Sequence, residues 1–151
     1  MELQIIRTRH PPEVYIQQLE DLLQTSGFLS QPGDLRKRIG EMPHGDRLLL
    51  AVEGDKLVGY AHLRVAHELL FDESAELITI IVHPEHRRKG IGRRLVSAAE
   101  SWARQSGRGR LVMRINVTET PAHAFYVALG YEQSKTLLEF VRPLDEPDAK
   151  S

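Results

Sequence analysis

The sequence predicts a mixed α/β domain in which strands and helices alternate. Residues 76–82 form a nearly continuous β-branched, apolar run, as expected of a strand that is covered on both faces. From Ile91 onward, apolar residues recur every three or four positions, as on the face of a helix that packs on a sheet. Glycine and proline punctuate the apolar runs, which marks turns between the elements.

One strand and two helices are expected in the N-terminal part of the chain. In order, they cover residues 3–7, 12–24 and 34–39. Pro12 suits the first helical position, and Gly27 ends that helix. Gly33 and Gly40 bracket the second helix in the same way.

The middle of the chain is predicted to be β-structure. Residues 48–52 and 56–66 form two apolar runs joined by Gly54-Asp55, a short connection that suits a hairpin. A turn over residues 68–74 then leads into the strand 76–82.

The C-terminal part returns to alternating elements. They are a helix from Ile91 to Gly107, a strand over 111–117, a helix over 121–129 that stops at Gly130, and a last strand over 137–141. Residues 145–151 have no pattern and are expected to form a flexible tail. Residues 1–144 are thus expected to form a single domain.

Composition excludes several classes of function. The chain has 151 residues and no cysteine, which rules out thiolate catalysis, thiolate zinc sites and disulfides. Its 20 Lys and Arg against 21 Asp and Glu argue against a surface built for nucleic acid. No apolar stretch reaches the roughly 20 residues of a membrane span, and no signal-peptide pattern begins the chain. We therefore expect a cytoplasmic protein.

The segment after strand 76–82 is predicted to bind a phosphate. Gly90 and Gly92 let the backbone approach an anion, and the first N–H groups of the following helix point toward it. Basic side chains crowd the same loop, at Arg87, Arg88, Lys89, Arg93 and Arg94. His83 and His86 have a spacing that could suit a metal, but these five cations make the loop a poor cation site, so no metal is expected.

Two motifs give the chain a family resemblance. Arg87, Gly90 and Gly92 match the pattern Arg/Gln-x-x-Gly-x-Gly/Ala. A second motif is matched at Ala122, Phe125, Tyr126, Leu129, Gly130 and Tyr131. With both motifs in this order, the chain resembles the GNAT superfamily of acetyl-coenzyme A dependent N-acetyltransferases over nearly its whole length.

The resemblance implies a strongly bent mixed sheet of six to seven strands, flanked by about four helices, whose central parallel strands splay apart near Val82 and Val117. Coenzyme A, carried as the co-substrate acetyl-CoA, would lie between them. By analogy, its binding residues are Ile81, Val82, Arg87, Arg88, Lys89, Gly90, Ile91, Gly92, Arg93, Asn116 and Phe125.

Direct transfer of acetyl to a primary amine needs a base for the ammonium proton and an acid for the departing thiolate. Tyr126 matches the family's general acid, with aromatic packing as its alternative role. Glu76 is the candidate general base, directly or through water, and a solvated strand-end carboxylate is the alternative. His83 and His123 are further titratable candidates, or else polar surface residues.

The chain departs from the family pattern at two positions. Glu119 stands where many relatives have a cofactor-binding Asn, for which Asn116 could substitute unless it only satisfies backbone groups. Arg114 replaces a Glu common in enzymes that acetylate protein N-termini. His123 resembles the branch of bacterial small-amine and antibiotic acetyltransferases. A small-molecule amine is therefore the expected acceptor, with a protein lysine or N-terminus second.

Two other classes of function compete with the enzyme. A non-catalytic acyl-CoA sensor would keep the phosphate loop without an effective base. A nucleic-acid binder would need a wider basic face than residues 87–94 provide, so no nucleic-acid or membrane partner is expected. Many relatives dimerise, and the resemblance accordingly implies a homodimer.

Overall fold

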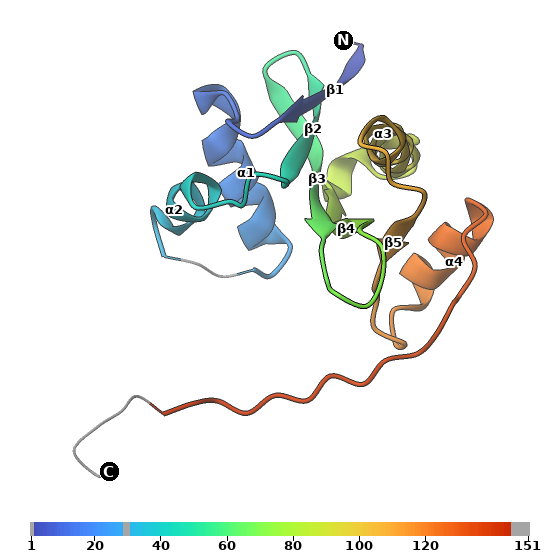
Figure 1. Cartoon of the computed structure of the whole chain (residues 1–151). Coiled ribbons are helices and arrows are strands. Elements are labelled where there is room, and N and C mark those ends of the chain that lie inside the picture. Colours follow the sequence, from blue (N-terminus) through green and yellow to red (C-terminus); the bar gives the residue numbers. More distant parts are fainter. Residues whose placement is uncertain (1, 29–30, 146–151) are drawn as a thin grey trace. The chain divides into compact units, whose positions relative to one another are not determined.

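The protein is built from two compact units, of which the first carries the sheet (Figure 1). The computed structural model describes residues 2–28 and 31–145. The first unit ends at Arg114 and the second begins at Ile115. Whether residues 1–144 act as a single domain stays a prediction.

The sheet of the first unit is mixed, as expected. Its strands are β1 (Leu3–Thr8), β2 (Arg47–Glu53), β3 (Lys56–Ala66), β4 (Ser74–Val82) and β5 (Leu111–Met113). They lie in the spatial order β1-β2-β3-β4-β5. Every neighbouring pair is antiparallel except β4 and β5, which run parallel. This sheet has five strands in the described residues, fewer than the six to seven expected.

The hairpin predicted at Gly54-Asp55 is confirmed. Glu53 of β2 pairs with Lys56 of β3, which leaves a two-residue connection. Gly54 has a φ of 64°, the left-handed conformation that glycine adopts without a steric penalty.

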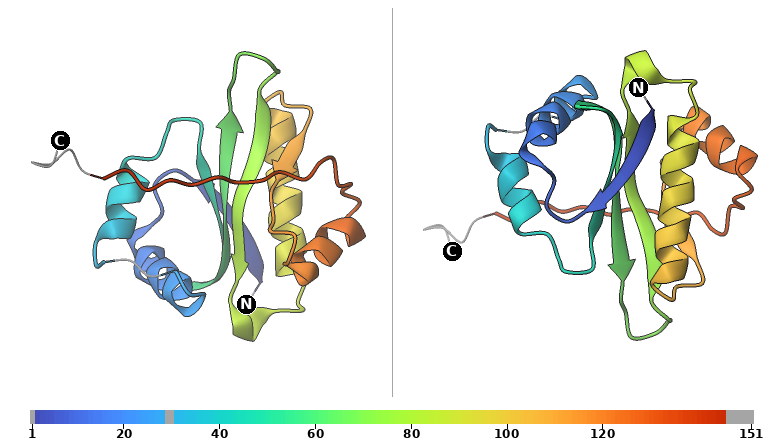
Figure 2. Two further views of the ribbon diagram at one scale, coloured as in Figure 1. Left: turned by 90° about the horizontal axis from the view of Figure 1, so that it is seen from below. Right: turned by 90° about the horizontal axis from the view of Figure 1, so that it is seen from above.

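The helices occupy the regions that glycine and proline delimit in the sequence. They are α1 (Glu13–Thr25), α2 (Asp34–Gly40), α3 (Ile91–Gln105) and α4 (Thr120–Ala128), with a short 3₁₀ turn η1 (Pro84–His86) before α3. Within the first unit, α1 and α2 lie on one side of the sheet and α3 on the other (Figure 2). The described part of the chain thus has the four helices expected.

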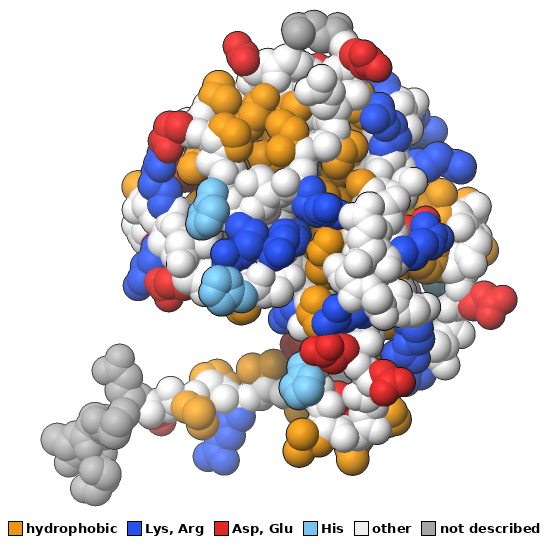
Figure 3. Space-filling view, turned by 45° about the horizontal axis from the view of Figure 1, so that its top comes forward, with side chains coloured by type: hydrophobic (Ala, Val, Ile, Leu, Met, Phe, Trp, Pro, Cys, Tyr) orange, Lys and Arg blue, Asp and Glu red, His pale blue; other side chains and the backbone are white. Residues whose placement is uncertain are grey.

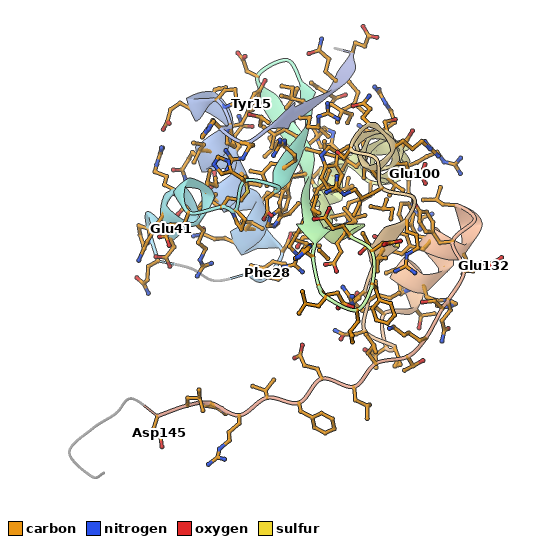
Figure 4. The ribbon with its side chains drawn as sticks, in the orientation of Figure 1. Tyr15, Phe28, Glu41, Glu100, Glu132 and Asp145 are labelled. Carbon is orange, nitrogen blue, oxygen red and sulfur yellow. The ribbon has the colours of Figure 1, made fainter. Side chains whose placement is uncertain are left out.

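The core forms where helices cover the sheet. On the α1 side, Tyr15, Leu19 and Leu22 pack with apolar residues of β2 and β3, among them Leu50 and Tyr60. Tyr15, labelled in Figure 4, also donates a hydrogen bond from its hydroxyl to the carbonyl of Gly54, at 2.7 Å. This bond ties α1 to the hairpin turn.

Two strand predictions were wrong. Residues 132–145 contain no strand, and their apolar side chains are exposed, with Phe140 at 89%. Residues 111–117 form a strand only to Met113, because the parallel pairing with β4 stops at Leu77. Apolar composition favours a strand, but a strand persists only where a neighbouring edge accepts its hydrogen bonds. Residues 146–151 of the expected tail lie outside the described residues.

No helix in the described residues is long and apolar enough to cross a lipid bilayer.

Candidate active site

An open backbone edge on β4 is the central feature of the site. β5 pairs with β4 only from Ala75 to Leu77, yet β4 continues to Val82. No strand in the described residues pairs with the β5-facing edge of residues 78–82. Ile81 and Val82, both predicted to contact the cofactor, lie on this segment and are partly buried. Their main-chain groups can therefore receive an extended ligand as an added strand.

A β-bulge interrupts β4 at the start of this edge. His62 of β3 pairs with Thr79, and the next residue, Leu63, pairs with Leu77. Ile78 is the extra residue on β4, and its side chain is 36% exposed. Bulges bend a strand and often occur beside active sites, where they redirect side chains. Here the bulge coincides with the point where β4 loses its neighbour β5.

The loop after β4 presents unpaired N–H groups at the start of α3. Arg88 has a φ of 64° and Gly90 a φ of 78°, so the chain turns sharply at both residues. The N–H groups of Ile91, Gly92 and Arg93 are the first three of the helix and have no hydrogen-bond acceptor among the described residues. Together with the helix dipole, they form a site suited to a phosphate anion.

Cationic side chains surround these N–H groups. All five of them, Arg87, Arg88, Lys89, Arg93 and Arg94, are exposed. Arg94 also donates to the carbonyl of Leu3 at 3.1 Å, which links α3 to β1. The other four cations remain available to an anionic ligand.

Two histidines precede the cationic residues. The ring of His83 accepts a hydrogen bond from the N–H of Glu85 at 3.2 Å, so it caps the 3₁₀ turn. His86 is buried, which lowers the pKa of its imidazole, and the nearby Lys89 and Lys56 lower that pKa further. The loop therefore gains no charge from His86 near neutral pH.

Gly59 lets the start of α3 approach the sheet. A Cβ atom at this position would lie 3.0 Å from the carbonyl oxygen of Ile81 and 3.4 Å from the side chain of Ile91. A side chain here would press on the backbone of β4 and on the first turn of α3, which the missing Cβ of glycine avoids. The close contact holds the N–H groups of α3 next to the end of β4.

Glu76, the candidate base, lies buried in an ion-pair cluster that spans three strands. Arg64 of β3 donates to one carboxylate oxygen at 2.8 Å, and Arg114, directly after β5, donates to the other at 3.0 Å. Burial alone would raise the pKa of Glu76, but the hydrogen bonds from the two guanidinium groups outweigh it and lower the pKa. The carboxylate is therefore held ionised and fully engaged.

A second buried carboxylate was not predicted from the sequence. Asp46, just before β2, has a side chain only 5% exposed, and its Oδ2 lies 2.8 Å from Nε2 of His62. The side chain of His62 is 29% exposed. Only the period-two alternation of β3 could have shown that His62 shares a sheet face with Tyr60 and Arg64.

The second unit carries the remaining predicted residues. Tyr126 on α4 is buried, with its ring against the edges of Phe125 and Tyr131. Burial raises the pKa of its phenol, and Glu119 raises it further. Asn116 is exposed, so the alternative of a buried strand-end amide does not hold, and its side chain donates to Glu119 at 3.2 Å.

The predicted site residues thus fall into three groups. Those of the phosphate loop and the end of β4 lie together in the first unit. Glu76 lies on the same strand, two residues before the bulged Ile78. Asn116, Phe125 and Tyr126 belong to the second unit.

Comparison with known proteins identifies the family. Residues 14–131 match the model of the acetyltransferase (GNAT) family. The chain belongs to this family. It is therefore an acyltransferase, and the mixed sheet and four helices of the described residues match the fold of GNAT neighbours.

Two GNAT relatives are named for small molecules. An aminoglycoside N(6')-acetyltransferase type 1 from Stenotrophomonas maltophilia is 30% identical over 106 residues, which cover 68% of each chain. A mycothiol acetyltransferase from Thermomonospora curvata is 34% identical over 118 residues, 78% of this chain but 36% of the relative. The chain thus spans about two thirds of the first relative and little more than a third of the second.

Solved structures confirm the fold. The aminoglycoside N-acetyltransferase AAC(6')-Iy in complex with CoA superimposes with a TM-score of 0.76 at 15% identity, over 93% of this chain and 100% of that chain. A soil-metagenome aminoglycoside acetyltransferase in complex with sisomicin has a TM-score of 0.81 at 18% identity, over 95% and 97%.

Proposed function

We propose that this GNAT protein transfers an acetyl group from acetyl-CoA directly to a primary amine of a small molecule, in a ternary complex and without an acetyl-enzyme. The observation that carries the proposal is the open edge of β4, which leads straight into the N–H groups at the start of α3. An acyl-CoA carries its anionic phosphates and its extended, amide-containing arm in this same order. The residues present therefore fit the co-substrate.

The first unit offers a partner for each part of the co-substrate. The N–H groups of residues 88–93 and the exposed cations of the loop hold the pyrophosphate. The main chain of Ile81 and Val82 pairs with the pantetheine amides. Asn116 and Phe125 are proposed as further contacts on the resemblance alone.

Tyr126 is proposed as the general acid. The bound thioester supplies an activated acetyl group, and its thiolate leaves with a pKa of about 8.5 if it resembles cysteine. A phenol with a raised pKa stays protonated at neutral pH and keeps its proton available for that sulfur. This is the protonation state that the acid role requires.

Glu76 is a poor direct base in this geometry. Both of its oxygens accept from arginines, and its lowered pKa reduces its affinity for a proton. A role through water stays a prediction. The cluster more directly supports a positioning role, because it holds β3, β4 and the end of β5 together where β4 loses its neighbour.

The acceptor is proposed to be a small amine. The curated relatives are named for aminoglycosides and mycothiol, both small molecules. A protein lysine or N-terminus is the second acceptor class. We also propose that two copies form a homodimer.

The test combines turnover with binding. Thiol release from acetyl-CoA is measured against aminoglycosides, polyamines, amino acids and a lysine peptide, and cofactor binding is measured by calorimetry on the same sample. Turnover on one small-amine class is the expected result. Tight binding without turnover on any class would favour the acyl-CoA sensor, and absence of binding would refute the phosphate loop.

A further inference from the structure

One sheet face carries a histidine and carboxylate pair that the proposed roles leave unused. Alternate residues of a strand share a face, so His62 lies on the same side of β3 as Tyr60, which packs against α1. Asp46 holds Nε2 of His62 at 2.8 Å. In the described residues, Nδ1 of the ring has no hydrogen-bond partner. A buried carboxylate thus orients an imidazole whose other nitrogen is free.

The bulge places this pair beside the open edge of β4. His62 pairs directly with Thr79, the residue that follows the bulged Ile78. Neighbouring strands lie about 4.8 Å apart, so an arm added to the open edge of β4 would lie about 9.6 Å from β3, and an acceptor amine lying over β4 would stand between the arm and the imidazole. The open edge begins at Ile78, so His62 lies one strand away from the segment proposed to hold the thioester arm.

The charges around the pair favour a proton acceptor over a structural ion pair. The titratable and charged side chains on the adjoining segments are Arg9, His44, Arg47, Tyr60, Arg64 and Glu76. Arg9 and Arg47 donate to backbone carbonyls of residues 42–46, and Arg64 is paired with Glu76. Burial raises the pKa of Tyr60, which keeps its phenol neutral. Asp46 is therefore the carboxylate that neutralises a protonated His62.

We propose that His62 is the general base of the acetyl transfer and that Asp46 is its positioning residue, an inference that rests on the proposed function. Nδ1 of His62 accepts a proton from the acceptor ammonium. The freed amine nitrogen then bonds to the thioester carbonyl carbon, the carbon–sulfur bond breaks, and the sulfur takes a proton from the general acid. The attacking nitrogen loses its second proton as the amide forms, and a proton returned through water restores the general acid. The proton on His62 passes to solvent, since the ring is partly exposed.

This assignment differs from a purely structural role in what it predicts. A structural pair would only fasten the segment before β2 to β3, and its loss would reduce stability without changing catalysis by the protein that remains folded. A base instead takes part in the chemical step, so its loss lowers kcat/KM in protein that is still folded.

The first test is His62→Gln, assayed with the best amine found for the wild type, with His67→Gln as a matched control. His67 is 71% exposed and pairs only with Glu73. We expect kcat/KM for the amine to fall about 100-fold in His62→Gln, the usual contribution of a general base. Acetyl-CoA binding and the control should stay near wild type. Activity within about threefold of wild type would overturn the proposal.

The second test separates chemistry from folding. Added imidazole should restore activity to His62→Ala. Asp46→Asn should lower kcat and leave acetyl-CoA affinity unchanged, because the ring loses the carboxylate that orients it. Loss of activity in His62→Ala without rescue by imidazole would overturn the proposal. If the wild type binds acetyl-CoA but turns over no amine, the proposed function fails first, and the base assignment falls with it.

Discussion

At the scale of single residues, the two buried carboxylates, Glu76 and Asp46, differ in the side chains that they pair with. Glu76 is shared by two arginines, whereas Asp46 faces one partly exposed imidazole. The guanidinium groups stay charged at every accessible pH, but the imidazole can gain and lose a proton. Glu76 therefore suits a structural role and the Asp46–His62 pair suits proton transfer.

Glu76→Gln should destabilise the protein in a way that depends on pH. The native pKa of Glu76 is lowered, so its contribution is present above its unfolded pKa of about 4.3 and is lost as pH falls through the native pKa. We expect the free energy of unfolding at pH 7 to fall by about 1–3 kcal/mol. Urea unfolding of the wild type and of Glu76→Gln at pH 7 and below pH 4 measures the difference in unfolding free energy. An equal difference at both pH values would contradict the ion-pair account.

Tyr126→Phe should reduce turnover while leaving cofactor binding intact. Removing the hydroxyl removes the proposed acid, and we expect kcat to fall about 100-fold. Because burial and Glu119 raise the pKa of the wild-type phenol, its proton should be lost only above the ordinary range of a tyrosine. Thiol-release assays measure the turnover number, and calorimetry on the same sample measures acetyl-CoA affinity. Val127→Ala, exposed on the same helix, is the control.

At the scale of elements, the phosphate loop depends on how closely α3 approaches β3. Gly59 permits this approach, and the apolar residues of α3, such as Leu95 and Trp102, then bury against the sheet. The first N–H groups of α3 owe their position to this packing as well as to the glycines in the loop.

Gly59→Ala should displace the first turn of α3. Its Cβ would lie 3.0 Å from the carbonyl oxygen of Ile81 in β4 and 3.4 Å from the side chain of Ile91 in α3, so both elements must give way slightly, and we expect a loss of about 1–3 kcal/mol in stability. Affinity for CoA should fall with it, as measured by calorimetry. Gly109→Ala, where no atom lies within 4 Å of the new Cβ, is the control. Unchanged CoA affinity in Gly59→Ala would show that the phosphate loop does not depend on this packing.

The same scale explains which elements could be predicted. The hairpin at Gly54 and the helix from Ile91 depend on turn chemistry and local periodicity, which are visible in the sequence. The early end of β5 at Met113 and the absence of a strand over 137–141 depend on whether a neighbouring edge is available. The composition of a segment does not show whether a neighbouring strand has a free edge to pair with it.

At the scale of the whole molecule, the site also has one part that the sequence predicts and one part that it does not. The phosphate loop was predictable because glycines, basic residues and a helix start lie adjacent in sequence. The Asp46–His62 pair and the cluster around Glu76 were not, since each joins residues from different strands through the sheet register. A single sequence does not show which strands are neighbours.

We propose residues 132–145 as the surface of the proposed homodimer. Five of their apolar side chains are more than half exposed: Leu137, Leu138, Phe140, Val141 and Leu144. Figure 3 shows such side chains, in orange, along the segment that leads to the C-terminal end. Contiguous apolar exposure of this kind usually marks a surface that another protein covers. A second copy of the chain is the partner that the family resemblance implies.

The double variant Leu138→Ser/Phe140→Ser should therefore convert a dimer into a monomer. Leu138 is 81% exposed and Phe140 is 89% exposed, so the substitutions remove apolar surface without opening the core. Light scattering over a range of concentrations should give twice the chain mass of 17.2 kDa for the wild type and a single mass for the variant. Glu139→Ser, between the two positions, should leave the dimer intact. A wild type that stays monomeric at every concentration would refute the homodimer, whereas a variant that stays dimeric would place the interface on another surface.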